Sequence, residues 1–329
     1  MANSTLKQIS EGLGLSISTI SRALKDHPDI SAKTKKRVIE LAIALDYEPN
    51  VNAINLRTSK RKLFGLIVPT ISHLFYNSFV SAVEEESRKS GYSLMILQSG
   101  DDPDNEITNL KLFRQNRIAG LFVCLSSSTT NIEPFLKLEE QEVPVIFFDK
   151  VPEMEGCNKV CVADTQSAIL GANAILNKKK KKVLGIFGNP DLLITKKRLA
   201  AFTSTLKEKQ GHKVELIIEF ATSAEEAEHI ALNRFKDKID VVFCMSDEIL
   251  IGAIKAIQKT ELVIPRDIAI IAISDGFIPK LFTPEITYAE TSGYKLGKLA
   301  FSSMIACMGG SSFQEELTSA SVLINGGSL

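Results

Sequence analysis

Two kinds of hydrophobic spacing divide the chain, and the change between them falls near residue 63. Before that point, apolar residues recur three or four positions apart, which is the spacing of amphipathic helices. From Phe64 onward, short apolar runs rich in β-branched residues alternate with amphipathic stretches of helical length. The pattern predicts a small helical segment followed by a larger α/β region.

The segment Thr5 to Leu24 is typical of two short helices joined by a turn. Gly12-Leu13-Gly14 offers a permissive backbone for the turn, and Ser16 is a suitable N-cap for the second helix. Ile20 and Leu24 share the apolar side of that helix. The residues that face elsewhere suit the wall of a DNA major groove, and they are Ile17, Ser18, Ser21 and Arg22. Taken alone, the segment fits a solvated helical hairpin equally well.

A third helix is predicted from Ser31, a second N-cap, to about Leu45, with an apolar stripe that includes Val38. Three helices in so short a segment can share a very small core, as in a helix-turn-helix domain. The stretch Asn50 to Lys62 is polar and basic in its second half. On its own it would be disordered, or helical only when packed against something.

The α/β region contains a regular alternation of strands and helices, which implies parallel sheets with helices on both faces. Predicted strands cover 64–69, 93–98, 119–125, 144–148, 183–187, 214–220, 240–245 and 268–273. Predicted helices lie near 76–90, 104–116, 165–178, 196–210, 223–236 and 247–260.

An internal repeat indicates that this region consists of two similar lobes. Gly65 and Gly185, Gly91 and Gly211, and Cys124 and Cys244 are each 120 residues apart. Ligands of such sheets bind outside the carboxyl ends of the strands, so two facing lobes predict a cleft lined by strand-end residues. These residues are Ser72 to Tyr76, Asp149, Asn189, Phe220, Ser246-Asp247 and Ser274-Asp275. Those residues mix carboxylates, hydroxyls and aromatic rings, which suits a polar ligand such as a sugar or a nucleobase. For Asp164 and Asp247, each just before a predicted helix, a capping role is the competing interpretation.

The distribution of charge also separates the first 62 residues from the rest of the chain. The chain of 329 residues has no formal net charge, with 39 basic and 39 acidic residues. Residues 1–62 contain eleven Lys or Arg and six Asp or Glu, a net of +5, so the remainder carries −5. A basic head on an acidic body is typical of a nucleic-acid-binding module fused to another domain.

Several classes of protein are not expected. There is no apolar run long enough to span a membrane and no secretory leader, so we expect a cytoplasmic, nucleoid-associated protein. The sequence lacks the common catalytic motifs, and its four histidines and five cysteines show no metal spacing. We therefore expect neither an enzyme, nor a metal site, nor a cofactor, and interpret Cys157 and Cys161 as buried free thiols.

The chain resembles the lactose-repressor (LacI/GalR) family of bacterial transcription regulators over nearly its whole length. The strongest match is Leu15 to Leu24, LSISTISRAL, against the family pattern V-S-x-x-T-V-S-R-x-L. Further matches follow in order and at the right spacing, namely Val38, Leu41, Tyr47-x-Pro49-Asn50, Leu56-Arg57-Thr58 and the strand Gly65 to Pro69.

The resemblance implies roles for residues of the head. Ile17, Ser18 and Arg22 would contact base edges, with Arg22 reading guanine. Ser16, Thr19 and Ser21 would bind phosphates or cap the helix. Residues 50–56 would form a hinge helix in the minor groove, and its contact residues would be Asn50, Ala53 and Leu56.

The resemblance also implies a fold, namely a small all-α helix-turn-helix head joined by a hinge to a two-lobed α/β core of the type I periplasmic-binding-protein kind. The implied domains are 1–48, a hinge and linker at 49–62, and an effector-binding and dimerisation domain at 63–329. Its N-lobe would comprise about 63–160 plus 291–320, and its C-lobe about 161–290. The implied effector contacts are Ser72, Phe75, Tyr76, Asp149, Arg198, Phe220, Ser246, Asp247 and Asp275.

Three places depart from the family pattern. Asp46 stands where Gly is common, Lys7-Gln8 stands where an Asp is frequent, and Thr287 to Thr291 replaces T-T-V-x-Q-P. The chain has no Trp, so a sugar site built on indole stacking is excluded.

The sequence therefore predicts a transcription factor, a repressor that binds a palindromic double-stranded operator as a homodimer or tetramer. A small polar effector in the cleft, such as a sugar, sugar phosphate or nucleobase, would control it by coupling between sites. Two alternatives stay open, a solute-binding protein without a DNA role and a regulator controlled by a protein corepressor.

Overall fold

The computed structural model describes residues 5–47, 61–208, 214–311 and 316–329, which form two compact units divided between Arg61 and Lys62. The first unit contains three helices in its described part: α1 (Leu6–Leu13), α2 (Ile17–Leu24) and α3 (Ala32–Ala44). Their shared core is Ile9, Ile20, Ala23, Val38 and Ala42, so the predicted apolar stripes do meet.

The turns of this unit follow from local side-chain chemistry. Thr5 and Gln8 form a reciprocal capping box at the start of α1, and Gly14 ends that helix with a φ of 66°. Ser16 and Ser31 cap α2 and α3 through their hydroxyl oxygens, as predicted. Asp46, where the family commonly has Gly, adopts a φ of 48°. Asp is among the few residues that tolerate this left-handed backbone, which explains why the substitution is accommodated.

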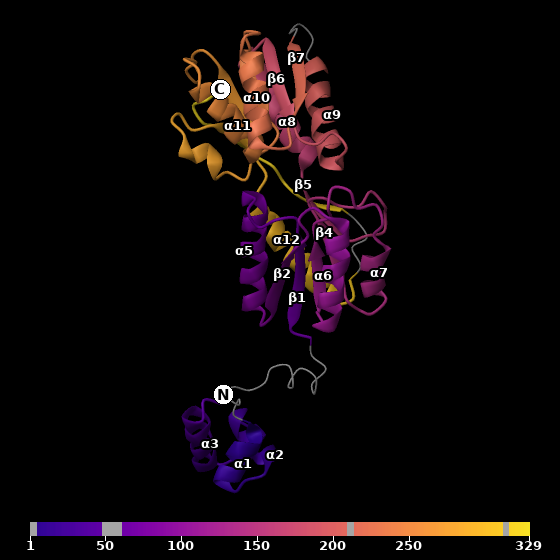
Figure 1. The fold of residues 1–329 in the computed structure, drawn as a ribbon, viewed down its shortest axis with the longest axis vertical. Coiled ribbons are helices and arrows are strands. Elements are labelled where there is room, and N and C mark those ends of the chain that lie inside the picture. Colours follow the sequence, from indigo (N-terminus) through magenta and orange to yellow (C-terminus); the bar gives the residue numbers. More distant parts are fainter. Residues whose placement is uncertain (1–4, 48–60, 209–213, 312–315) are drawn as a thin grey trace. The chain divides into compact units, whose positions relative to one another are not determined.

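The second unit contains two six-stranded sheets, each of which forms one lobe (Figure 1). The N-lobe sheet has the order β11-β5-β4-β3-β1-β2. Its strands are β1 (Leu63–Val68), β2 (Ser93–Gln98), β3 (Gly120–Val123), β4 (Val145–Phe148), β5 (Lys159–Val162) and β11 (Glu316–Ser319). Every pairing in this sheet is parallel, and β3 and β4 are buried along their whole length, as expected for a sheet covered on both faces.

Helices cover both faces of the N-lobe sheet. Their bounds are α5 (Leu74–Lys89), α6 (Pro103–Gln115), α7 (Glu133–Glu139) and α12 (Gly293–Met308). One face packs on α5 and α12 through a cluster that includes Phe79, Leu296 and Leu66. The other face packs on α6 and α7 through a cluster that includes Phe113, Phe135 and Ile67.

The C-lobe repeats this plan with the order β12-β10-β9-β8-β6-β7. Its strands are β6 (Lys182–Phe187), β7 (Glu215–Phe220), β8 (Val241–Cys244), β9 (Ala269–Ser274), β10 (Thr287–Glu290) and β12 (Leu323–Ile324). Its helices are α8 (Asp164–Asn177), α9 (Leu193–Glu208), α10 (Ala224–Phe235), α11 (Asp247–Gln258) and the 3-10 turn η1 (Ile278–Leu281). Only β12 pairs antiparallel among the described strands.

The predicted repeat corresponds to these two lobes. Gly65 in β1 and Gly185 in β6 occupy matching strands, and a Cβ on either would lie 2.9 Å from an aromatic ring. Cys124 and Cys244 come at the ends of the matching strands β3 and β8 and are both buried. The third predicted pair includes Gly211, which lies outside the described residues.

The chain passes between the lobes three times, between β5 and α8, between β10 and α12, and between β11 and β12. The predicted strands and helices are present, but β5, β10, β11, β12, α7 and α12 were not among them. None of the helices in the described ranges is long and apolar enough to cross a membrane.

Candidate functional site

The exposed side of α2 is the candidate nucleic-acid surface. Ile17 is 50% exposed although it is a large apolar residue, and Ser18 and Arg22 are exposed beside it. Ile20 and Ala23 on the opposite side are buried in the core of the head, so the helix cannot turn its exposed residues inward. Ser21 is half-buried.

Hydroxyl groups fix the start of α2. The Ser16 oxygen accepts a hydrogen bond from the Thr19 amide at 3.1 Å and lies 2.8 Å from the Thr19 hydroxyl. Ser16 therefore caps the helix, one of the two roles that the resemblance implied for it. The predicted contacts Asn50, Ala53 and Leu56 lie outside the described residues.

The second candidate site is a pair of cavities between the strand ends of the two lobes. The smaller cavity has a volume of about 140 Å³ and the larger about 440 Å³, and both are lined by Asp149 and Ile194. Seven predicted effector residues line the smaller cavity, namely Phe75, Tyr76, Asp149, Arg198, Ser246, Asp247 and Asp275.

Arg198 is buried at this site and makes an ion pair. It is 5% exposed, and its Nε and a terminal nitrogen each lie 2.8 Å from Oδ1 of Asp164, which is 6% exposed. The other terminal nitrogen donates to the Met245 carbonyl oxygen at 2.9 Å. Burial raises the pKa of Asp164, and the guanidinium offsets part of that rise. The neighbouring Lys196 and Lys197 would favour solvent exposure of Arg198 from the sequence, but this interpretation is wrong because the side chain is buried in its ion pair with Asp164 of α8.

Asp247 and Asp275 form a hydrogen-bonded network at the ends of β8 and β9. Asp247 accepts hydrogen bonds from the Ser274 hydroxyl and from the Asp275 amide at 3.0 Å. Asp275 accepts from the Ser78 hydroxyl and from the Gly293 amide, both at 2.6 Å. Since Ser78 belongs to α5 of the N-lobe, this network joins the two lobes.

The capping interpretation of Asp164 and Asp247 is not supported. Ser246 is the N-cap of α11 and accepts from the Ile249 amide, whereas Asp247 lies in the first turn and binds β9. At α8 the N-cap is Ala163, and the Asp164 carboxylate binds Arg198. A carboxylate in the first turn is still favoured there by the helix dipole.

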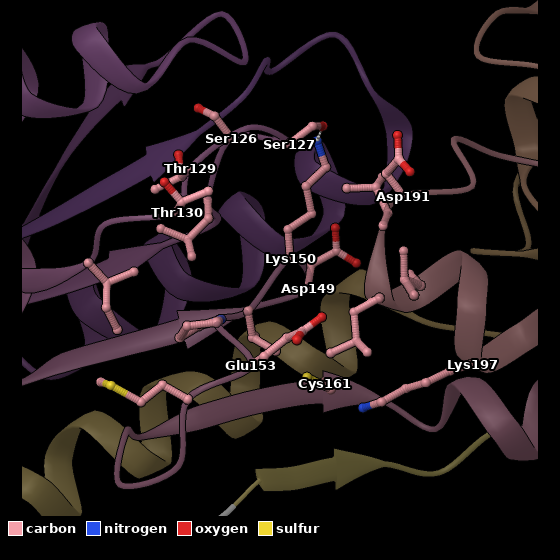
Figure 2. Close-up of a pocket in the computed structure, with 18 of the residues that line it drawn as sticks. Ser126, Ser127, Thr129, Thr130, Asp149, Lys150, Glu153, Cys161, Asp191 and Lys197 are labelled. Carbon is pink, nitrogen blue, oxygen red and sulfur yellow. Dashed lines mark hydrogen bonds between the residues drawn. The ribbon is translucent and has the colours of Figure 1, made fainter.

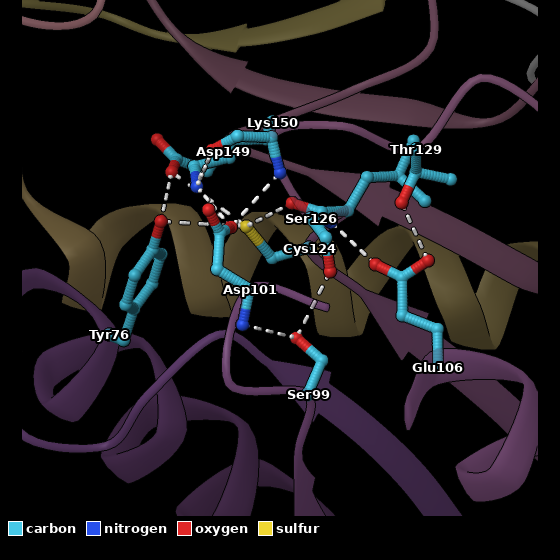
Figure 3. Close-up of polar contacts among 11 residues, drawn as sticks. Tyr76, Ser99, Asp101, Glu106, Cys124, Ser126, Thr129, Asp149 and Lys150 are labelled. Atoms are coloured by element: carbon cyan, nitrogen blue, oxygen red, sulfur yellow. Dashed lines mark hydrogen bonds and ion pairs between the residues drawn. The ribbon is translucent and has the colours of Figure 1, made fainter. Parts of the chain in front are cut away.

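Asp149 lies at the wall shared by the two cavities, directly after β4, with a φ of 59°. The Tyr76 hydroxyl donates to Asp149 Oδ2 at 2.8 Å, and the Cys124 thiol lies 3.5 Å from the Tyr76 oxygen (Figure 3). Burial and the nearby carboxylate raise the pKa of Tyr76 well above its usual value. Tyr76 is therefore a neutral donor at physiological pH.

The larger cavity is bounded on one side by the loop after β3. In Figure 2, Ser126, Thr129 and Thr130 lie to one side of Asp149 and Lys150. Ser127 lies at the tip of Lys150, whose ammonium donates to the Ser127 hydroxyl at 2.8 Å. The loop is fixed from below by Glu106 of α6, which is 1% exposed and accepts hydrogen bonds from the Ser126 amide and, at 2.8 Å, from the Thr129 hydroxyl. The opposite side comes from Asp191 to Lys197 of the C-lobe.

Two predicted effector residues lie elsewhere. Among the described residues that line these two cavities, Ser72 and Phe220 are not found. Phe220 ends β7, the edge strand of its sheet, and is 39% exposed. The strand order explains this position. β7 is the edge strand of the C-lobe sheet, whereas the cavities lie at the ends of more central strands.

Sequence reasoning overlooked several lining residues. The run Ser126 to Thr130 follows the strand end at Leu125, so the rule that identified Asp149 and Asp275 would have found it too. Thr291, at the end of β10, lines the smaller cavity where the family pattern is altered. No cluster of three or more His, Cys, Asp or Glu side chains in the described ranges could hold a metal ion.

Comparisons with known proteins match both units. Residues 5–50 match the model of bacterial regulatory proteins of the lacI family, and residues 64–281 match the periplasmic binding protein domain. The chain is 26% identical to the HTH-type transcriptional regulator RegA of Clostridium saccharobutylicum, over 92% of this chain and 91% of that protein. It is 25% identical to the HTH-type transcriptional repressor PurR of Mannheimia succiniciproducens, over 90% and 89%.

The fold has close counterparts among solved structures. The Lac repressor bound to ONPG in its repressed state superposes with a TM-score of 0.87 at 18% identity, and the match covers 100% of both chains. A periplasmic binding protein/LacI transcriptional regulator from Alkaliphilus metalliredigens, complexed with D-xylulofuranose, has a TM-score of 0.71 at 20% identity, over 81% of this chain and 98% of that one.

Proposed function

The chain belongs to the LacI family of bacterial regulatory proteins, and we propose that it is a transcriptional repressor that binds a palindromic operator as a homodimer. The observation that carries the proposal is the exposed face of α2. Ile17, Ser18 and Arg22 stay exposed because Ile20 and Ala23 anchor the helix to the core. An exposed Arg next to small side chains is suited to reading guanine in the major groove.

The remaining head residues take supporting roles in this proposal. Ser16, Thr19 and Ser21 bind phosphates or hold the start of the helix, and Asn50, Ala53 and Leu56 form the hinge contacts. The exposed Lys33 and Arg37 of α3 add phosphate contacts, whereas Lys35 is paired with Asp26 at 2.6 Å and Lys36 lies 3.9 Å from Glu40. In this proposal the domains are 1–48, 49–62 and 63–329. The predicted lobe boundaries need two changes, because β5 of the N-lobe sheet extends to Val162 and β12 at Leu323–Ile324 belongs to the C-lobe sheet.

The two cavities are the proposed effector site. They lie at the carboxyl ends of the strands of both lobes, where ligands of such sheets bind, and seven of the nine predicted effector residues line the smaller one. A polar molecule bound there contacts both lobes and so alters operator affinity, since Asp275 already links the lobes through Ser78.

This assignment implies a protein that is not an enzyme and that works in the cytoplasm, on the chromosome. Two alternatives come from the sequence: a solute-binding protein without a DNA role, which is another class of protein, and, within the family, a regulator controlled by a protein corepressor. Neither is favoured by an observation as specific as the exposed face of α2.

Binding selection with random duplexes tests the proposal. The full chain is expected to select a palindrome and to bind it with two chains per duplex. Arg22→Ala should relax the preference at one position in each half-site, because it removes a base contact. The matched control Lys33→Ala should weaken binding about uniformly across sequences and reduce the salt slope by about 1. If Arg22→Ala behaves like the control, Arg22 contacts only phosphate and the proposed reading is wrong.

A further inference from the structure

The Lys and Arg side chains that line the two cavities are each neutralised by a carboxylate of the protein. The pairs are Arg198–Asp164 at 2.8 Å, Lys150–Asp101 at 2.8 Å and Lys197–Glu316 at 3.1 Å. Lys150 also lies near Asp149, but its ammonium donates its hydrogen bonds to Asp101 and to the Ser127 hydroxyl (Figure 3). Among the described lining residues, the cavities therefore offer an anionic ligand no Lys or Arg that is free of a protein carboxylate.

The acidic side chains at the same walls outnumber these bases. Within the described ranges, five lining acids make no ion pair with Lys or Arg: Asp149, Glu153, Asp191, Asp247 and Asp275. Three of them, Asp149, Asp247 and Asp275, face the smaller cavity, whose volume is only about 140 Å³. The site thus holds an excess of negative charge in a confined space.

The acids of the smaller cavity are fixed in place by neutral donors. Asp247 and Asp275 accept their hydrogen bonds from hydroxyls and backbone amides, and Asp149 accepts from the Tyr76 hydroxyl. A carboxylate offers about four lone-pair positions, so each retains capacity for a further donor. Oriented acceptors of this kind bind a charged donor without the cost of ordering side chains first.

The neighbouring carboxylates of this wall repel one another. Burial and the neighbouring Asp247 raise the pKa of Asp275, and burial also raises the pKa of Asp247. His73 lies near Asp247, and its Nδ1 is buried with no hydrogen-bond partner in the described part of the chain. A ligand that brought a positive charge and a polar group to this wall would relieve the repulsion and satisfy the imidazole.

We propose that the effector of this site is a cationic molecule that also carries hydroxyl groups, of the class of aminated sugars and polyols. This inference rests on the proposed function in one respect, namely that the cleft binds an effector. The ammonium would lie against Asp247 and Asp275, and the hydroxyls would meet Arg198. Three of the five guanidinium N–H groups are used within the protein, which leaves two for a ligand.

A phosphorylated ligand is disfavoured by the same geometry. Its charge would face Asp149, Asp247 and Asp275. Of the described bases on the smaller cavity's wall, Arg198 is already neutralised by Asp164, and His73 lies beside Asp247. Like charges brought together in a water-poor site repel strongly. A neutral sugar would not be repelled, but it would bring no positive charge to balance the negative charge of the carboxylates.

Thermal unfolding of the full chain with matched probes tests the inference. D-glucosamine and D-galactosamine carry an ammonium, their N-acetyl forms are neutral, and their 6-phosphates add negative charge. At millimolar concentration, at least one free amino sugar is expected to raise the unfolding midpoint by about 2 °C or more, because a ligand that binds only the folded state stabilises it. The N-acetyl and phosphorylated forms should produce no comparable shift.

Substitutions of the acids that line the smaller cavity test whether the amino sugar binds there. Asp275→Asn should weaken amine binding at least about tenfold, since it removes a charge that contacts the ligand. Because this change could disturb Ser78 and Gly293, Asp149→Asn is the second variant. It should also weaken amine binding, since it removes a negative charge from the wall of the same small cavity. The matched control is Glu155→Gln, an exposed acid on the same segment that lines neither cavity. It should retain wild-type binding.

The results of these binding experiments distinguish failure of the proposed ligand class from failure of the proposed repressor function. A neutral or phosphorylated sugar that stabilises the chain while both free amino sugars fail overturns the inference, as does the absence of a shift with every probe. In both cases operator binding can still be measured, so the proposed repressor function is judged on its own. If an amino sugar binds but leaves operator affinity unchanged, the ligand class stands and the proposed control of DNA binding is wrong.

Discussion

The guanidinium of Arg198 and the carboxylate of Asp164 lie 34 positions apart in the sequence and 2.8 Å apart in the fold. The family resemblance predicts a ligand contact for Arg198 but could not supply its protein partner, because the pairing depends on how α8 packs on α9. The strand-end rule succeeded for Asp149, Asp247 and Asp275 because it needs only the chain order. It failed for Phe220, since which strand lies at an edge is a property of the assembled sheet.

Loss of the Arg198 side-chain charge should destabilise the protein strongly. Arg198→Met leaves Asp164 buried without its partner, and we expect a loss of about 3–5 kcal/mol in the free energy of unfolding, measured with denaturant. The exposed neighbour Lys196→Met serves as the control and should change stability by less than about 0.5 kcal/mol. A loss below about 1 kcal/mol for Arg198→Met would show that water reaches Asp164 and that the pair is not the buried contact described above.

At the scale of elements, the helix α12 shows what hydrophobic periodicity leaves out. Its sequence includes Gly293 and Gly297, residues that weaken a helix in isolation, and it was not predicted. In the fold these glycines let α12 approach α5 closely. A Cβ on Gly293 would lie 2.3 Å from the Phe75 carbonyl oxygen, and one on Gly297 would lie 2.7 Å from that of Phe79. Tertiary packing thus decides an element that local propensity disfavours.

Gly297→Ala should therefore lower the free energy of unfolding, although replacing Gly by Ala in a helix usually raises it through helix propensity. The added methyl group must push α12 away from the backbone of α5, so we expect a loss of about 1–3 kcal/mol in denaturant unfolding. Ser302→Ala on the exposed side of the same helix is the control and should stay within about 0.5 kcal/mol of the wild type. A Gly297→Ala variant as stable as the control would mean that the two helices are not packed this tightly.

At the scale of the whole molecule, the chain order alone indicated a basic helical head and a two-lobed acidic sensor. The repeat at an offset of 120 residues revealed the two lobes because duplicated strands keep their small residues at matching positions. The three crossings between lobes were harder to see, since β5, β10, β11 and β12 are strands of only two to four residues. Such strands carry too little periodicity to be separated from loops.

The measurement that tests the central claim most directly compares two dissociation constants of the full chain at about 150 mM salt, where non-specific attraction is weakened. One is for the selected palindromic duplex and the other for a scrambled duplex of the same composition. If α2 reads bases, the palindrome should bind at least about 10³-fold more tightly. Equal affinity for the two duplexes would contradict the assignment of this chain as a sequence-specific repressor.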